Sequence, residues 1–195
     1  MVEYLIHLDQ QIFLWIQHHC HTAFLDTLLP LMRNKETWYP LYILVIIILV
    51  YKFRKVGFRM VLVGVFCFLI SDLLSSQIAK PLFKRLRPCA DPVISQQFTP
   101  TIKCGNRGYS FTSSHAANHF AVALGLSLFF YNTKKWLLLT GIMWAGIISL
   151  SQVYVGVHYP LDILGGAFIG ITVSLSFHIL INKYFTKKFM HKINL

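Results

Sequence analysis

The stretch from Met60 to Ala79 reads MVLVGVFCFLISDLLSSQIA and contains a single charged side chain, Asp72. A helix crosses the ~30 Å hydrocarbon core of a bilayer with about 20 predominantly apolar residues. The length and composition of this stretch therefore predict a membrane-spanning helix, and they decide the fold class.

Four further stretches have the same character: Thr37–Tyr51, Ala116–Thr133, Trp136–Val157 and Ile163–Asn182. Hydrophobic residues make up 55% of the 195 residues and charged residues 13%, about half the ~25% charge of a soluble domain. We therefore expect an all-α polytopic membrane bundle with about five transmembrane helices. It forms one domain over residues 1–195, with a helical core at 37–182 and a basic cytoplasmic tail at 183–195.

Residues 1–36 differ from the spans because polar side chains interrupt their apolar residues at helical spacing. Glu3, Asp9 and Gln17 lie among leucine, isoleucine and aromatic residues, a mixture typical of an amphipathic helix in the membrane interface. The alternative is a sixth span through Phe24–Met32, but nine residues are too few to cross a bilayer.

The distribution of lysine and arginine predicts the orientation of the spans. Cations without nearby acids gather at alternate span ends: Lys52, Arg54, Lys55, Arg59, Lys134, Lys135, Lys183, Lys187, Lys188 and Lys192. The positive-inside rule places this side in the cytoplasm. The N-terminus, the loop from Lys80 to Ser114 and the junction after Val157 then face outward. That loop is rich in cations although it lies on the outer side, so we expect it to bind an anionic ligand. The formal net charge of +11 is thus assigned to phosphate or lipid headgroups, and no nucleic-acid partner is expected.

The first polar motif begins the outer loop, as KPLFKRLRP over residues 80–88. If the helix continues to Pro88, Lys80, Lys84 and Arg87 fall at i, i+4 and i+7 and share one face. Lysine and arginine on one face suit a phosphate group. A basic cluster against anionic lipid is the alternative.

Two more motifs are expected on the same membrane face. Ser113 and Ser114 precede a span, where side chains cap the helix and its first N–H groups attract anions, with His115 beside them. Further on, His158 and Asp162 are four residues apart across a turn. A carboxylate there can orient one ring nitrogen of the histidine and increase the basicity of the other. Each motif alone also has an ordinary structural explanation, and their convergence on one face favours a site.

Together the motifs resemble the type 2 phosphatidic acid phosphatase superfamily, which includes lipid phosphatases and vanadium haloperoxidases. The shared pattern is Lys, six residues, Arg-Pro, then Ser-x-His, then Ser, six residues, His, three residues and Asp, and it covers roughly residues 36–182. The resemblance implies that His158 is the nucleophile that forms a phosphohistidine, that Asp162 orients it, and that His115 protonates the leaving oxygen. It also implies that the phosphate is bound by Lys80, Arg87, Ser113, Ser114 and the residue at position 152.

Position 152 departs from this pattern, because the third motif usually begins Ser-Arg and here reads Ser151-Gln152. One missing donor in a dry site can cost ~3 kcal/mol of transition-state stabilisation. Changing Gln152 to Arg is then expected to raise activity, unless Lys84 or Arg107 has filled the same place. A milder departure is Thr112-Ser113-Ser114-His115 in place of the usual Pro-Ser-Gly-His.

The resemblance implies a bacterial inner-membrane enzyme with a periplasmic site and a lipid phosphate substrate, without metal or cofactor. Undecaprenyl diphosphate is the first candidate substrate, and phosphatidylglycerol phosphate, phosphatidic acid and lipid A phosphate are alternatives. A noncatalytic lipid-phosphate binder or transporter is the alternative of another class, with Gln152 as its best argument. The oligomeric state is open. So is a disulfide between Cys89 and Cys104 in the outer loop, and the run from His18 to His21 favours polar residues at a helix end over a metal site.

Overall fold

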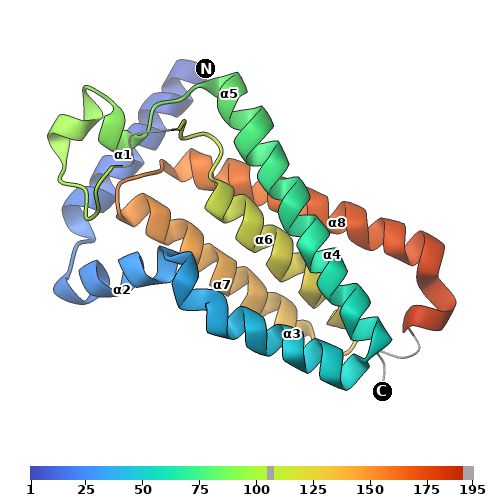
Figure 1. Ribbon diagram of the computed structural model, residues 1–195. Coiled ribbons are helices and arrows are strands. Elements are labelled where there is room, and N and C mark those ends of the chain that lie inside the picture. Colours follow the sequence, from blue (N-terminus) through green and yellow to red (C-terminus); the bar gives the residue numbers. More distant parts are fainter. Residues whose placement is uncertain (105–107, 191–195) are drawn as a thin grey trace.

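The computed structural model describes residues 1–104 and 108–190, the last seven of them as backbone alone, and this part of the chain contains helices and no strands. Its main helices form a bundle (Figure 1): α3 (Tyr39–Phe53), α4 (Lys55–Asp72), α6 (Ser114–Ser127), α7 (Lys135–Tyr154) and α8 (Pro160–Met190). The π-helical stretch η2 (Leu73–Ala79) and the short α5 (Lys80–Phe83) extend α4. The predicted all-α polytopic bundle is confirmed.

Four helical stretches are long and apolar enough to cross a membrane: Lys35–Phe53, Lys55–Gln97, Lys135–Tyr154 and Pro160–Lys183. Large apolar side chains on them are exposed, among them Ile47, Leu139 and Phe168. Surface of this kind needs an apolar solvent, so the outside of the bundle faces lipid.

The fifth predicted span, Ala116–Thr133, differs from the other four. Its α-helix, α6, has 14 residues and continues only into the 3-10 turn η5 (Leu128–Phe130). At 1.5 Å per residue such a helix is about 21 Å long. It lies in the middle of the bundle, against α4, α7 and α8. An inner helix surrounded by protein does not have to reach both membrane surfaces, which explains why it is short.

Helices α6 and α8 pack with their backbones in close approach. A β-carbon added at Gly166 would lie 2.3 Å from the Ser113 carbonyl oxygen, and one at Gly170 would lie 2.3 Å from that of Ala117. Small residues four apart allow membrane helices to approach in this way. The contact holds the N-terminus of α6, where the second motif begins, beside the N-terminus of α8, where the third motif ends at Asp162.

The two ends of the bundle differ in character. The α3–α4 turn and the C-terminal part of α8 lie at the lower right in Figure 1, whereas α1, α2 and the α7–α8 turn lie at the left. The described cations of the predicted cytoplasmic group belong to the first end, and all three motifs belong to the second. Lys192, from that predicted group, lies outside the described residues.

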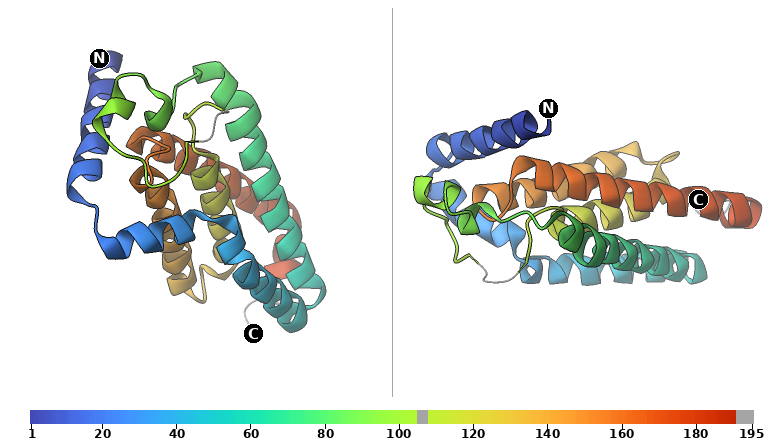
Figure 2. Two further views of the ribbon diagram at one scale, coloured as in Figure 1. Left: turned by 60° about the vertical axis from the view of Figure 1, so that its left-hand side comes forward. Right: turned by 90° about the horizontal axis from the view of Figure 1, so that it is seen from above.

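The N-terminal segment forms two helices, α1 (Val2–His19) and α2 (Ala23–Arg33). Helix α1 lies at the edge of the bundle near the α7–α8 turn (Figure 2) and turns Asp9 and Gln17 inward, 2% and 7% exposed. Its apolar residues Leu5, Ile12 and Trp15 are exposed. Helix α2 has 11 residues, about 16 Å of helix, which is too short for the alternative sixth span.

The outer loop is closed by a disulfide between Cys89 and Cys104, whose Cα atoms are 5.7 Å apart. Cys89 packs against a buried cluster formed by Tyr154, Val155 and Val157 at the end of α7. The bridge therefore holds the loop against the segment that leads into His158.

Candidate active site

The turn between α7 and α8 directs His158 into the protein. Gly156 has φ +85, and a β-carbon there would lie 2.5 Å from the Phe98 ring, so this position requires glycine. The backbone N–H of His158 donates to the carbonyl oxygen of Gln152 at 3.3 Å. The His158 side chain is 3% exposed, and burial lowers its pKa although Asp162 opposes the shift. The imidazole is therefore neutral at neutral pH, as a nucleophile must be.

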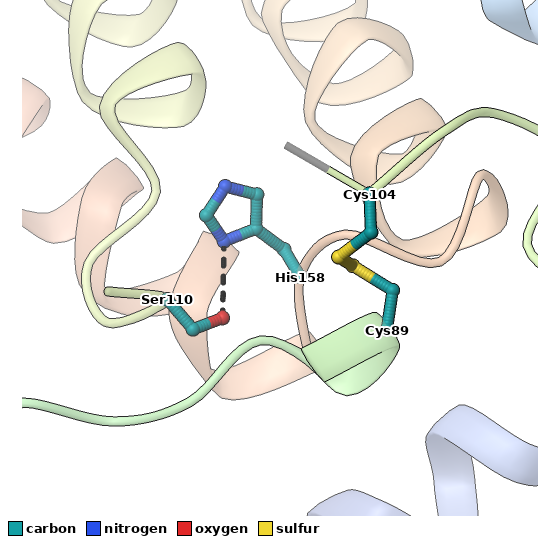
Figure 3. The surroundings of a disulfide bond; sticks show 4 residues. All are labelled: Cys89, Cys104, Ser110 and His158. Carbon is teal, nitrogen blue, oxygen red and sulfur yellow. Dashed lines mark hydrogen bonds between the residues drawn. A yellow bond between two sulfur atoms is a disulfide. The ribbon is translucent and has the colours of Figure 1, made fainter. Parts of the chain in front are cut away.

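A serine joins His158 to Asp162. Ser110 Oγ lies 3.4 Å from His158 Nδ1 (Figure 3) and donates a short hydrogen bond to Asp162 Oδ2. The direct distance from His158 Nδ1 to Asp162 Oδ2 is 3.5 Å, long for a hydrogen bond. Because both oxygens face Nδ1, this nitrogen carries the proton and Nε2 keeps its lone pair. The sequence motif indicated the His158 and Asp162 pair, and nothing in the motif indicated Ser110.

Arg85 connects Asp162 to the N-terminal helix. Its guanidinium donates to Asp162 Oδ1 at 2.9 Å and to Asp9 Oδ2 at 2.6 Å, and it lies 4.0 Å from the centre of the Tyr159 ring. The other oxygen of Asp9 accepts from the Leu161 backbone N–H at 2.8 Å. Both carboxylates are almost fully buried. Arg85 thus binds one oxygen of Asp162, while the other oxygen lies at Ser110 and His158. In this way Arg85 holds Asp162 in place beside His158.

The predicted single helical face of Lys80, Lys84 and Arg87 is wrong. Helix α5 ends at Phe83, and Lys84 adopts a left-handed conformation with φ 49. Lys84 is exposed, and the next side chain, Arg85, turns inward to its two carboxylates. The physical reason is tertiary: the buried ion network outweighs the local preference to continue the helix.

Lys80 and Arg87 still converge on His158, one from α5 and one from the loop. Both lie close enough to His158 and Asp162 for their charges to interact with them. Neither forms an ion pair within 4.0 Å among the described residues, and Arg87 Nε is buried without a hydrogen-bond partner there. Unneutralised cations beside a buried nitrogen nucleophile favour the binding of an anion.

The N-terminus of α6 completes this side of the site. Ser113 is the cap residue: its Oγ accepts from the Ala116 N–H at 3.4 Å, and its own N–H donates to the Asp162 carbonyl oxygen at 2.9 Å. Ser114 Oγ is bonded to Ser75 and Ser76 of η2 at 3.0 and 2.9 Å. These contacts fix the N-terminus of α6, whose first backbone N–H groups have no acceptor within the helix.

His115 stands in the first turn of α6, within electrostatic range of His158, Arg33 and Lys80. Its neighbour His119 is held by the His115 carbonyl oxygen at 2.8 Å and by the Tyr42 hydroxyl at 3.1 Å. His119 is thereby engaged in structural contacts, while burial, together with the charges of His119, His158, Arg33 and Lys80, lowers the pKa of His115 to about 3.

Gln152 is 1% exposed and lies at the end of α7. Its Oε1 accepts from Arg33 Nε at 3.4 Å, and its Nε2 has no hydrogen-bond partner among the described residues. Burial and the charge of Arg87 lower the pKa of the Arg33 guanidinium. Arg33 was not among the predicted site residues, and Arg107, suggested as a substitute cation, lies outside the described residues.

The histidines of the run from His18 to His21 point to separate partners. His18 contacts the Gln97 carbonyl oxygen, His19 contacts that of Trp15, and His21 pairs with Asp26 at 2.7 Å. In the described ranges, no group of three His, Cys, Asp or Glu side chains is placed to hold a metal ion.

The fold and the side chains at its end define a class of protein: a helical membrane protein with a buried histidine and aspartate beside cations that form no ion pair among the described residues. The chain belongs to the PAP2 superfamily, whose family model matches residues 41–186. It is therefore a multi-pass membrane lipid phosphatase, a phosphoric ester hydrolase.

Two relatives and one solved structure illustrate the similarity. The chain is 32% identical over 173 residues to a lipid A 4'-phosphatase of Bacteroides thetaiotaomicron, covering 87% of this chain and 75% of the relative. It is 31% identical over 143 residues to an undecaprenyl-diphosphatase of Sulfolobus acidocaldarius, covering 72% and 62%. The crystal structure of a PAP2-type phosphatidylglycerolphosphate phosphatase from Bacillus subtilis superposes with a TM-score of 0.72 at 21% identity, covering 95% of this chain and 90% of that one.

Proposed function

We propose that this protein removes the 4'-phosphate from lipid A through a phosphohistidine intermediate on His158. The proposed chemistry is supported by the neutral, oriented His158 surrounded by cations that have no carboxylate partner of their own. The observation that carries the substrate is the 32% identity over 87% of the chain to a lipid A 4'-phosphatase. Undecaprenyl diphosphate, the first candidate from the sequence, is the second candidate, and the undecaprenyl-diphosphatase relative supports it.

In the first step, His158 Nε2 attacks phosphorus while the bond from phosphorus to the sugar oxygen breaks. Asp162 and Ser110 hold the proton on Nδ1 and stabilise the positive charge that develops on the ring. Lys80 and Arg87 bind the non-bridging oxygens, whose charge they neutralise in the transition state. Burial and the nearby cations lower the pKa of His115 to about 3 without a bound anion. The charge of the entering phosphate opposes that shift, so His115 takes up a proton on substrate binding and gives it to the departing sugar oxygen.

In the second step, water attacks the phosphohistidine and inorganic phosphate leaves. His115, now without its proton, accepts one from that water, and His158 Nε2 regains its lone pair. The cycle closes with every proton accounted for.

We place this site on the periplasmic face of the bacterial inner membrane, because the cations at the other end of the bundle are expected in the cytoplasm. A phosphate on a lipid headgroup lies at that depth in the outer leaflet, within reach of a site at the end of the bundle.

Phosphate release from purified protein tests the proposal, with chelator present and a panel of four lipids: lipid A, undecaprenyl diphosphate, phosphatidylglycerol phosphate and phosphatidic acid. We expect the highest kcat/KM with lipid A, with loss of the 4'-phosphate in the mass spectrum. His158→Ala should abolish release, and His19→Ala, a histidine outside the site, should retain it. Release from undecaprenyl diphosphate alone would favour the second candidate. No release from any lipid by the folded protein would favour a noncatalytic binder.

A further inference from the structure

The family pattern has an arginine at position 152, and here two side chains, Gln152 and Arg33, meet at that point. Gln152 brings a neutral amide to a position where the family pattern has a guanidinium. Arg33 brings a guanidinium to that amide from α2, with Nε 3.4 Å from Gln152 Oε1. Positions 33 and 152 are 119 residues apart in the chain, and the two side chains meet at the site.

Packing at the end of α7 fixes the approach of α2. The Tyr154 hydroxyl donates to Asp26 Oδ1 at 2.7 Å, and Leu25 and Leu29 pack against the cluster of Tyr154, Val155 and Val157. Arg33 is the last residue of this helix. Its direction toward Gln152 is therefore set by a helix that is anchored along its length.

The surroundings of Arg33 are cationic. Its charge interacts with that of Arg87 and with the ring of His115. No carboxylate lies within 4.0 Å of Arg33 in residues 1–104 and 108–190. Glu36, three residues away, is exposed and forms no ion pair with it. An arginine at the last turn of a helix also favours the helix dipole, but that role does not require burial beside a second arginine.

Three hydrogen-bond donors meet here, and among the described residues none of them has an anionic acceptor. Gln152 Nε2 and Arg87 Nε are buried without a partner in the described part of the chain, and the Arg33 guanidinium has a single neutral acceptor. Buried donors are almost always hydrogen-bonded, and neighbouring cations destabilise each other's charged form unless an opposite charge lies close to them. A phosphoryl group has the oxygens and the negative charge that all three donors need.

We propose that Arg33 binds the phosphoryl group of the substrate, in the role of the arginine that the family pattern has at position 152, while Gln152 positions its guanidinium. The inference rests on the proposed phosphatase function and names a further binding residue of the same site. Relative to the family pattern, the guanidinium comes from α2 and not from α7, and the charge of the site is the same.

The test uses four variants of the full-length protein in detergent or vesicles: Arg33→Ala, Gln152→Arg, the double variant Arg33→Ala/Gln152→Arg, and Lys35→Ala as control. Lys35 is an exposed cation two residues beyond Arg33, so its removal changes the local charge without touching the site. Two readouts are needed: kcat/KM for phosphate release from lipid A, and binding of orthovanadate by calorimetry, which does not depend on turnover.

Arg33→Ala should lower kcat/KM by about 10²- to 10³-fold, the usual effect of losing one transition-state donor, and should weaken vanadate binding at least tenfold. Gln152→Arg alone should lower kcat/KM, because Arg33 already supplies the charge and loses the amide oxygen that positions it. The double variant Arg33→Ala/Gln152→Arg should have a kcat/KM at least tenfold higher than that of Arg33→Ala. A merely structural role of Arg33 would not produce this recovery. Lys35→Ala should match the wild type.

Wild-type kcat/KM and vanadate affinity in Arg33→Ala would overturn the inference and leave the proposed function standing. If the wild type releases no phosphate from any lipid, the proposed function fails, and vanadate binding decides the inference by itself. Weaker binding in Arg33→Ala supports an oxyanion contact, and unchanged binding refutes it. If Arg33→Ala does not fold, Arg33→Gln replaces it with the same expectations.

Discussion

Replacement of Arg85 by methionine removes the cation between two buried carboxylates. The side chains of Asp9 and Asp162 are 1% and 0% exposed, and both accept from Arg85. Loss of one partner from a buried ion network costs about 3–5 kcal/mol, and the contact of the guanidinium with the Tyr159 ring is lost as well. For a chain of this size that corresponds to a fall in Tm of about 6–20 °C.

The same change should lower activity, because Asp162 loses one of the groups that hold it against His158. We expect Arg85→Met to lower kcat more than it changes KM, since Arg85 positions the nucleophile and does not face the phosphate. Thermal unfolding in detergent and phosphate release at saturating substrate measure the two effects. The matched double variant Arg85→Met/Asp9→Asn removes the orphaned charge of Asp9, whose pKa is already raised by burial, and should recover part of the lost Tm.

A Tm and kcat within error of the wild type in Arg85→Met would refute the reasoning about this network. A double variant less stable than Arg85→Met would show that Asp9 stabilises the protein through its Leu161 contact and not through Arg85. Lys84→Met is the control for loss of a neighbouring cation that is exposed.

Three further predictions concern the proton donor, the nucleophile and the topology. His115→Ala should slow release from lipid A more than from undecaprenyl diphosphate, because a phosphate leaving group needs less protonation than a sugar oxygen; equal losses would contradict its role as the acid. Because burial lowers the pKa of His158, its neutral form persists to lower pH, and the acid limb of kcat/KM should lie below pH ~6.5. That limb should move further down in Asp162→Asn, which removes the carboxylate that stabilises the protonated ring, and a limb that stays in place would belong to the substrate. Cysteine introduced at Lys135 and at Lys103 should react with an impermeant thiol reagent from opposite sides of the membrane, and labelling from one side would overturn the proposed orientation.

The sequence predicted the fold class because a bilayer requires long apolar helices whose backbone bonds are internal. The stretch from Met60 to Ala79 carries this signal in its composition alone. The length of α6 did not follow from the same rule, because an inner helix is shielded by its neighbours and not by lipid. Its packing partners, such as Gly166, become known only from the structure.

The site residues also fall into those that could be predicted from the sequence and those that could not. His158, Asp162, Lys80 and Arg87 could be predicted because their spacing lies within short motifs, and the structure brings them together, with their roles still to be tested. Ser110, Arg85, Asp9 and Arg33 could not, because each meets its partner across 48 residues or more. Arg85 stood in a basic run that the sequence did not resolve, and the left-handed turn at Lys84 decided which cation faces inward.

Trapping the covalent intermediate tests the central claim most directly. Protein mixed with 4'-³²P-labelled lipid A is quenched within milliseconds in alkaline detergent, which preserves phosphohistidine, and the labelled peptide is identified by mass spectrometry. We predict one labelled residue, His158, label that disappears on acid treatment, and no label in His158→Ala. Label on a different side chain, or full turnover by His158→Ala, would contradict the account.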